Sequence, residues 1–142
     1  MTTRTASARY EGFGKDGKGH VSTQSTVLAD SPYGFNTRFE NEPGTNPEEL
    51  IGAAHASCFT MALSFALAKA GFTAGTLETT AKVTLDTEGD GFTITYSALD
   101  LKAQVDGIDP AVFEEIAAGA KANCPVSKVL NAEISLTHTL NV

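Results

Sequence analysis

Residues 44–71 of this 142-residue chain read GTNPEELIGAAHASCFTMALSFALAKAG, and the stretch predicts one long helix. Asn46 can cap the helix, and Pro47 suits its first position because the proline ring presets a helical backbone. The two glutamates that follow are favoured at the positive end of the helix dipole. Gly71 predicts the end of the helix, since glycine readily adopts the left-handed conformation found there.

The middle of this helix, from Leu50 to Ala68, carries no charged residue. About 20 apolar residues suffice to cross a bilayer, but this segment contains His55 and several hydroxyl side chains and stands alone in an acidic chain. A helix that is apolar on all sides in a soluble protein must be buried on all sides. Because one domain of this size can hardly surround it, we expect a homodimer in which the Gly- and Ala-rich faces of two such helices pack together.

The remaining segments predict an α+β fold in a single domain, residues 1–142. Weak alternation with glycine turns predicts two strands within residues 5–28, followed by a loop over residues 31–40. Clear alternation predicts strands from residue 80 to 86 and from 92 to 105, with a bulge near Ala98–Leu99 where the phase shifts. Further cap, proline and alternation signals predict a helix opening at Asp109–Pro110, a short helix from Pro125 through Leu130, and a strand over residues 134–140.

Composition narrows the class of protein. The formal net charge is −7, and the ten basic residues are scattered, whereas a nucleic-acid surface needs a basic patch. Residues 1–12 are polar and lack the apolar run of a secretory signal, so we expect a cytoplasmic protein. In that compartment the two cysteines are either free or redox-active, or they are merely small buried apolar residues.

Cys58 lies in the middle of the long helix among apolar neighbours. Such surroundings raise the pKa of a thiol and leave it inert unless a cation is brought close. Arg38 is the candidate cation, because arginine stays charged when buried and this one sits between two aromatic residues, Phe35 and Phe39. A carboxylate is needed to hold such an arginine, and the nearest in sequence are Glu48 and its neighbour Glu49.

Distance along the helix constrains this arrangement. Glu48 precedes Cys58 by ten residues, which is ~15 Å at 1.5 Å per residue. A carboxylate on the same helix therefore cannot easily serve the thiol of its own chain. If two such helices cross antiparallel in a dimer, Glu48 of one chain approaches Cys58 of the other. We therefore expect an active site shared between subunits, with Arg38 and Glu48 reaching across.

Two further residues have alternative interpretations. Cys124 directly precedes Pro125 at a helix break, where free backbone N–H groups favour a thiolate; the alternative is an incidental buried cysteine. His55 and Cys58 form a His-x-x-Cys pair, which is half of a metal site. No other ligand pair accompanies it, so we expect no metal and interpret His55 as a packed histidine that hydrogen-bonds across the dimer.

With these residues identified, the sequence resembles the OsmC branch (osmotically inducible protein C) of the OsmC and organic-hydroperoxide-resistance superfamily. The resemblance covers nearly the whole chain. Its most specific part is GTNPEELIGAAHASCF at 44–59, supported by PYGFNTRFE at 32–40, CPVSKVLNAEI at 124–134 and Gly-Lys-Gly at 17–19.

The resemblance implies a thiol peroxidase, with Cys58 attacking a hydroperoxide to form a sulfenic acid and Cys124 resolving it to a disulfide. An external thiol or dithiol, of the lipoyl type for example, then restores the pair without a bound cofactor. Arg38 and Glu48 correspond to the family's catalytic arginine and glutamate. The implied fold is an intertwined α+β homodimer in which antiparallel sheets wrap around two long central helices.

Apolar residues close in sequence to the site suggest a preference for organic hydroperoxides over hydrogen peroxide, because an organic tail gains burial energy. The predicted substrate-binding residues are Phe35, Phe39, Phe59 and Met61, although each is also a candidate core residue. A redox sensor or binding protein that uses the same cysteine pair without turnover is the alternative function. A structural domain with an inert Cys58–Cys124 bridge is a third possibility.

Overall fold

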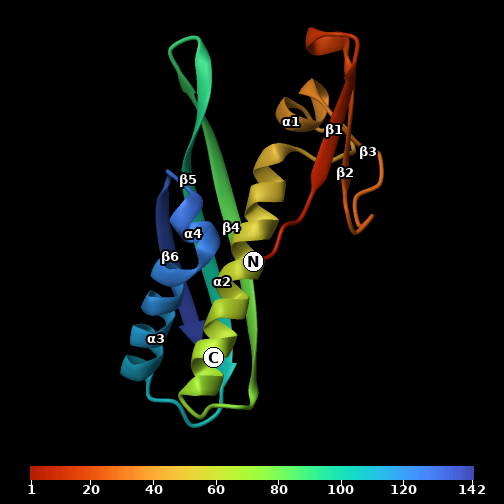
Figure 1. Ribbon diagram of the computed structural model, residues 1–142. Coiled ribbons are helices and arrows are strands. Elements are labelled where there is room, and N and C mark those ends of the chain that lie inside the picture. Colours follow the sequence, from red (N-terminus) through yellow and green to blue (C-terminus); the bar gives the residue numbers. More distant parts are fainter. The chain divides into compact units, whose positions relative to one another are not determined.

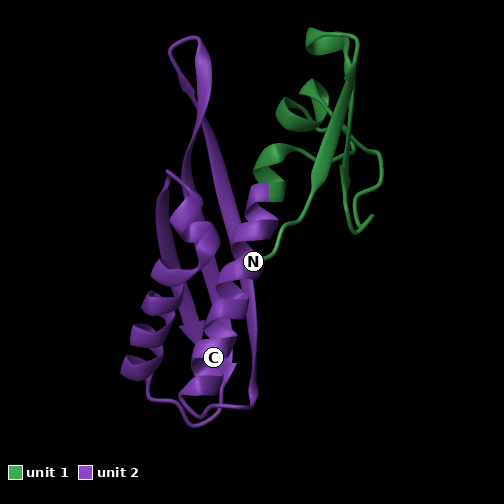
Figure 2. Ribbon diagram, viewed as in Figure 1, with its two compact units in different colours: residues 1–50 green, residues 51–142 purple.

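The computed structural model describes all residues from 1 to 142, and the chain forms two compact units, residues 1–50 (unit 1) and residues 51–142 (unit 2) (Figure 2). The mixed α+β class predicted from the sequence is confirmed, with four α-helices and two three-stranded sheets (Figure 1). Whether these units act as one domain, as we expected, stays a prediction.

Unit 1 contains a sheet in the order β1-β2-β3, with both pairs antiparallel. Its strands are β1 (Ala6–Glu11), β2 (Lys18–Thr23) and β3 (Ser31–Tyr33), and a single 3-10 turn, η1 (Gly14–Asp16), lies between the first two. The first two strands match the prediction. The segment expected to be a loop over residues 31–40 is instead β3 followed by a short helix, α1 (Phe35–Phe39).

Local hydrogen bonds explain α1. The Thr37 hydroxyl accepts a hydrogen bond from the backbone N–H of Gly34 (2.8 Å) and donates one to the Gly34 carbonyl (3.0 Å). These bonds satisfy backbone groups at the start of a helix too short to be stable by its own propensity. They hold Arg38, in the last turn of α1, in a fixed segment rather than on a free loop.

Unit 2 contains the second sheet, in the order β4-β5-β6. β4 (Gly75–Glu88) and β5 (Gly91–Val105) form a long antiparallel hairpin, whereas β6 (Glu133–Leu140) runs parallel to β5. The expectation of purely antiparallel sheets is therefore wrong, because α3 (Pro110–Asn123) and α4 (Pro125–Val129) carry the chain back between β5 and β6. The predicted bulge exists, but it leaves Thr95 unpaired rather than Ala98 or Leu99.

Helix α2 (Pro47–Lys69) begins and ends where the sequence predicts. The side-chain oxygen of Asn46 accepts a hydrogen bond from the N–H of Glu49 (2.9 Å), which is a standard N-cap. At the other end Gly71 has a φ of 98°, and the N–H groups of Gly71 and Phe72 reach back to the carbonyls of Ala68 and Leu67. This is a Schellman motif, which only a residue tolerating positive φ completes without strain.

The core of unit 2 lies between its sheet and helices α2 and α3 (Figure 1). Every second residue of β5 from Ser97 to Val105 is buried, as expected for a strand with one face on a core. Thr60 of α2 donates a hydrogen bond to Thr79 of β4 (2.7 Å), which ties the helix to the hairpin. The buried apolar residues come from α2 (Phe59, Leu63, Leu67), β5 (Leu99, Leu101, Ala103, Val105), the following turn (Ile108), α3 (Phe113, Ala117, Ala120) and Cys124.

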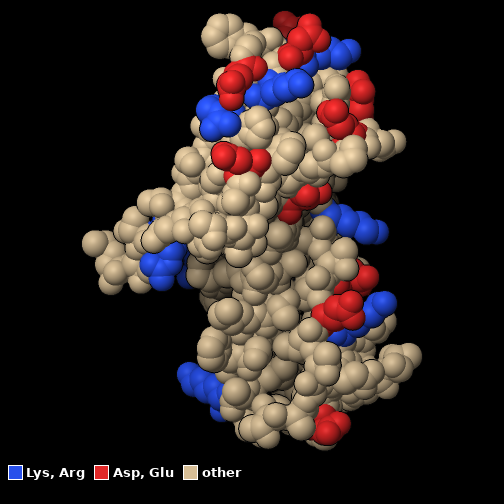
Figure 3. All heavy atoms as spheres, turned by 90° about the vertical axis from the view of Figure 1, so that its right-hand side faces the viewer, with Lys and Arg blue, Asp and Glu red and all other residues tan.

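One face of α2 is not covered within the chain. Phe65 is 70% exposed and Met61 is 61% exposed, although both belong to the uncharged stretch. By length and composition alone α2 is long and apolar enough to cross a membrane. Only 28% of its apolar 18-residue stretch is buried. The prediction that one chain cannot surround this helix is consistent with these exposures. On the face drawn in Figure 3, acidic and basic side chains are interspersed.

Candidate functional site

The two cysteines meet inside unit 2. Cys58 lies in α2 and is half-buried. Cys124 is fully buried, and it is the C-cap residue of α3 and the N-cap residue of α4. Both are free thiols, and their sulfurs interact with each other. The two cysteines are 66 positions apart in sequence, and no motif between them predicts the contact; only the family resemblance paired them.

The two thiols differ in acidity. Burial raises the pKa of Cys58, and the neighbouring Cys124 raises it further, while the Val126 N–H opposes the shift. Burial also raises the pKa of Cys124, but Cys58, the N–H and hydroxyl of Ser127 and the Val126 N–H outweigh it and leave this pKa lowered. Within one chain, Cys124 is therefore the more acidic thiol of the pair and Cys58 the less acidic one. This agrees with the expectation that Cys58 needs a cation from elsewhere.

Accessibility also separates the two thiols. A peroxide must reach the sulfur that it oxidises, and Cys124 has no exposed surface, whereas Cys58 is partly open. A fully buried thiol beside an accessible one suits the second step of a disulfide-forming reaction, because its sulfur can attack a neighbour but not a ligand from solvent. The two thiols therefore differ in access to solvent as well as in acidity.

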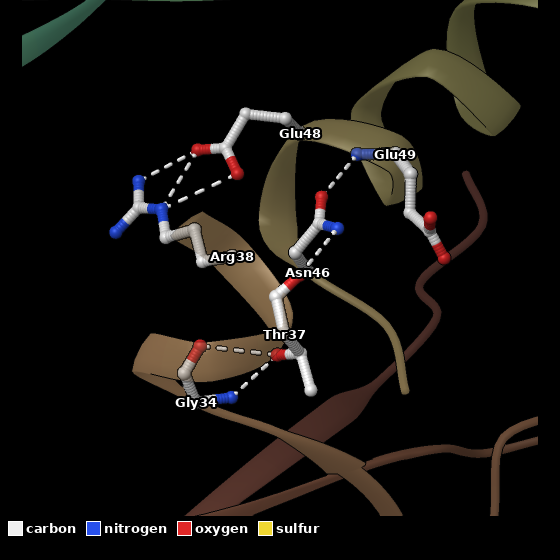
Figure 4. A network of polar contacts seen from close by, with 6 residues as sticks. All are labelled: Gly34, Thr37, Arg38, Asn46, Glu48 and Glu49. Carbon is white, nitrogen blue, oxygen red and sulfur yellow. Dashed lines mark hydrogen bonds and ion pairs between the residues drawn. The ribbon is translucent and has the colours of Figure 1, made fainter. Parts of the chain in front are cut away.

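Arg38 and Glu48 form the principal ion pair of unit 1 (Figure 4). Arg38 Nη2 lies 2.6 Å from Glu48 Oε1, and Arg38 Nε lies 3.0 Å and 3.3 Å from the two carboxylate oxygens. The Arg38 side chain is 33% exposed and that of Glu48 is 12% exposed. Of the two glutamates considered, the structure selects Glu48, since Glu49 accepts a hydrogen bond from the Thr45 hydroxyl instead (2.8 Å).

The surroundings of Arg38 fix its position further. Its guanidinium carbon lies 5.5 Å from the centroid of the Phe39 ring, within cation–π range. The Asn46 side chain, which caps α2, also donates a hydrogen bond to the Thr37 carbonyl of α1 (3.3 Å). The cap of one helix thus holds the other, and this places the arginine of α1 beside the first turn of α2 (Figure 4).

Of the four predicted substrate-binding residues, three are exposed to solvent and one is buried. Phe35 and Phe39 are 36% and 40% exposed, and their rings lie 5.0 Å apart on α1. Met61 is also exposed. The assignment of Phe59 is wrong: this side chain is fully buried in the core of unit 2 and cannot touch a substrate. One residue along a helix is a rotation of 100°, so the neighbour of Cys58 in sequence faces the core.

Met61 lines a hollow of about 860 Å³ in unit 2, together with Ala56, Thr60, Phe65 and other residues of α2, β4 and β5. Cys58 is not part of this lining. The hollow therefore follows the uncovered face of α2 rather than Cys58. Its position argues for a packing surface.

His55 is fully buried, and both of its ring nitrogens have partners in its own chain. Nδ1 lies 2.7 Å from the Ser97 hydroxyl of β5, and Nε2 lies 2.8 Å from the Ser127 hydroxyl of α4. The expectation of a hydrogen bond across a dimer is therefore wrong. Sequence reasoning missed both serines, which stand 42 and 72 residues away with no local signal. No group of three or more His, Cys, Asp or Glu side chains forms a metal site.

Comparison with known proteins decides the family. Residues 39–139 match the family model described as OsmC-like protein. The chain belongs to the OsmC-like family. It is 59% identical to Peroxiredoxin OsmC of Escherichia coli K12 over 133 residues, which cover 94% of this chain and 93% of that protein. It is 29% identical to the organic hydroperoxide resistance protein OhrA of Bacillus subtilis over 126 residues, 87% of this chain and 86% of the other.

Solved structures agree with this membership. The organic hydroperoxide resistance protein OhrB of Bacillus subtilis superposes with a TM-score of 0.72 at 27% identity, covering 97% of this chain and 98% of that one. An OsmC-like protein of Vibrio cholerae gives a TM-score of 0.77 at 14% identity, covering 98% and 100%, and this likeness concerns the fold alone. At the level of enzyme class, the predicted cysteine-based peroxidase is confirmed by these relatives.

Proposed function

We propose that this OsmC-like protein reduces organic hydroperoxides to alcohols through a Cys58 sulfenic acid that Cys124 resolves to a disulfide. The observation that carries the proposal is the thiol pair of unit 2, with one accessible and one fully buried sulfur in contact. The names of the relatives from Escherichia coli and Bacillus subtilis support the same chemistry.

The proposed cycle has three steps. The Cys58 thiolate attacks the terminal peroxide oxygen, the O–O bond breaks, and the departing alkoxide takes a proton to leave as alcohol. The Cys124 sulfur then attacks the Cys58 sulfenic acid, the S–S bond forms, and the S–O bond breaks with release of water. An external dithiol, of the lipoyl type for example, reduces the disulfide by thiol–disulfide exchange and becomes oxidised. No bound cofactor takes part.

Arg38 supplies the positive charge that Cys58 lacks, and Glu48 holds the arginine in place. In the proposed cycle the charge stabilises the Cys58 thiolate, whose pKa burial otherwise raises. The bidentate ion pair of unit 1 supports this role, because an arginine fixed by carboxylate and aromatic contacts is preorganised to meet an anion.

We further propose that the active protein is a cytoplasmic homodimer in which Arg38 and Glu48 of one subunit serve Cys58 of the partner subunit. The uncovered face of α2 supports the dimer, since Met61 and Phe65 are exposed along a hollow lined mainly by small and apolar residues. A second copy of α2 has the same small residues and permits close approach of two helices. Burial of these side chains then provides the driving force for association.

Organic hydroperoxides are the proposed preferred substrates. Phe35 and Phe39 present adjoining, partly exposed rings next to Arg38. Each buried CH₂ contributes ~0.8 kcal/mol, so even a partly buried tert-butyl group favours the organic peroxide over hydrogen peroxide by roughly tenfold or more. In this proposal Phe35 and Phe39, without the buried Phe59, contact the organic group of the substrate.

Steady-state turnover tests the proposed function. tert-Butyl hydroperoxide and hydrogen peroxide are each supplied with a dihydrolipoyl-type donor to the wild type, Cys58→Ser and Cys124→Ser. The proposal expects repeated turnover by the wild type with higher kcat/KM for the organic peroxide, and no turnover by Cys58→Ser. Retained turnover in Cys58→Ser contradicts it. Consumption that stops after one equivalent assigns the pair to a redox sensor instead.

A further inference from the structure

His55 is a buried, titratable residue that the proposed cycle does not use. Its side chain has no exposed surface and lies three residues before Cys58 in α2. Burial lowers the pKa of His55 below its ordinary value, so the imidazole is neutral near pH 7. A neutral imidazole has one nitrogen that donates a hydrogen bond and one that accepts, and both nitrogens of His55 face a serine hydroxyl.

Ser127 joins this histidine to the resolving cysteine. Cys124 is the N-cap residue of α4, and Ser127 is the third residue of that helix, the position whose side chain and N–H turn back toward the cap. Its hydroxyl lies 2.8 Å from His55 Nε2, and the same hydroxyl interacts with the Cys124 sulfur. The order of contacts is therefore Ser97, His55, Ser127, Cys124 and Cys58, all within unit 2.

A purely structural role for this set explains less of what is seen. Two serines that satisfy a buried histidine would tie α2 to β5 and α4, and any polar group on α4 would serve. Instead, the hydroxyl that contacts the imidazole is the one directed at the sulfur that must lose a proton. Cys124 is also closed to solvent, so water cannot take that proton directly. The groups that face the Cys124 sulfur are Cys58, the Val126 N–H, and the N–H and hydroxyl of Ser127.

We propose that His55 is a positioning residue for resolution: it holds the Ser127 hydroxyl against Cys124 and passes on the proton that this thiol loses when it attacks the Cys58 sulfenic acid. The inference rests on the proposed function, and it extends that function from the two cysteines to a buried relay of His55 and Ser127.

The proton balance of the step is complete. The Cys124 proton moves to the Ser127 oxygen as the Ser127 proton moves to His55 Nε2. The Cys124 sulfur forms the S–S bond and is oxidised, the Cys58 sulfur is reduced from sulfenic acid to disulfide, and the S–O bond breaks. The hydroxide that leaves recovers the proton from the relay and departs as water. No further oxidant or co-reactant is needed.

The test separates the two chemical steps in time. The chain has no tryptophan, so oxidation and disulfide formation are followed by quenched-flow mass spectrometry after mixing with tert-butyl hydroperoxide. Ser127→Ala is expected to slow disulfide formation by about tenfold to a hundredfold, the equivalent of one to two pKa units. Oxidation of Cys58 stays within about twofold of the wild type. Ser127→Thr, which keeps a hydroxyl, restores the rate, and His55→Asn resembles Ser127→Ala.

A second measurement does not depend on peroxide. In the Cys58→Ser background the ultraviolet thiolate absorbance of Cys124 is titrated against pH. Ser127→Ala is expected to raise the midpoint by about one unit or more, whereas Ser127→Thr and the control Ser135→Ala, at another half-buried serine on β6, leave it in place. This titration tests the relay even if a variant at His55 folds poorly.

The outcomes distinguish this inference from the proposed function. If the wild type fails to form a sulfenic acid, the proposed function is wrong, and the titration alone decides the relay. If sulfenic acid forms normally but Ser127→Ala resolves it at the wild-type rate, the relay is wrong and the cycle stands. An unchanged Cys124 midpoint in Ser127→Ala also overturns the relay. Equal slowing in Ser127→Thr and Ser127→Ala assigns the serine to packing instead.

Discussion

Replacing Glu48 by Gln isolates the part of the site that holds Arg38. Glutamine keeps the shape and one carbonyl oxygen of the carboxylate but loses its charge. In the structure three nitrogen–oxygen contacts of 2.6 Å, 3.0 Å and 3.3 Å join the two side chains. The variant therefore keeps at most one hydrogen bond from the charged guanidinium to a neutral amide oxygen, where the wild type has a bidentate ion pair.

The size of the effect follows from these contacts. The variant loses one hydrogen bond of the bidentate pair, ~1 kcal/mol, and the attraction between two opposite charges, roughly 0.2–1 kcal/mol for a partly exposed pair, so the loss is about 1–2 kcal/mol. Because the Arg38 side chain is 33% exposed, solvent screening favours the lower end of that range. If the whole loss falls on positioning the arginine for reaction, the rate constant for Cys58 oxidation falls roughly fivefold to thirtyfold.

Glu49→Gln is the matched control. It removes one negative charge from the same first turn of α2, so any loss of helix-dipole stabilisation is the same in both variants. Its carboxylate, however, contacts Thr45 rather than Arg38. The assay is quenched-flow oxidation of Cys58 by tert-butyl hydroperoxide. Equal rates in Glu48→Gln and Glu49→Gln, or a larger loss in Glu49→Gln, refute the role assigned to the ion pair.

Three further predictions concern charge, assembly and backbone. In the proposed dimer Arg38 of the partner subunit offsets the raised pKa of Cys58. Arg38→Met is then expected to move the pH at which the oxidation rate is half-maximal upward by about 1–3 units; an unmoved profile contradicts the proposal. Phe65→Glu places a charge on the exposed apolar face of α2. We expect monomers in analytical ultracentrifugation and low activity in the turnover assay, whereas fully active monomers exclude a shared site. In Gly71→Ala the new methyl group has free space, but the residue must keep a φ of 98°. Backbone strain alone is therefore expected to lower the free energy of unfolding by about 1–2 kcal/mol, which chemical denaturation measures.

Local signals explain what was predictable. The caps at Asn46 and Asp109 and the terminator Gly71 act through contacts within a few residues, so composition at those positions was sufficient to place α2 and α3. The bulge was expected from the alternation, which reports that the phase changes but only approximately where; it lies at Thr95, near the predicted position. The parallel pairing of β6 depends on where α3 and α4 return the chain, and no local pattern contains that information.

The residues of the site also differ in how far the sequence predicts their contacts. Arg38 and Glu48 are ten residues apart and could be paired from their chemistry, and the structure selects Glu48 over Glu49. Phe59 was misassigned because closeness in sequence to Cys58 does not fix the helix face. The partners of His55 come from β5 and α4, and long-range contacts of this kind between a histidine and two serines leave no trace in a single sequence.

The most direct test of the central claim is to locate the sulfenic acid. Cys124→Ser retains Cys58 as its sole cysteine and Cys58→Ser retains Cys124, and each is treated with one equivalent of tert-butyl hydroperoxide in the presence of dimedone and analysed by intact-mass spectrometry. Our account predicts a rapid dimedone adduct on Cys58 in Cys124→Ser and none in Cys58→Ser on the same time scale. An adduct that forms equally fast on Cys124, or an unmodified Cys58, contradicts the account.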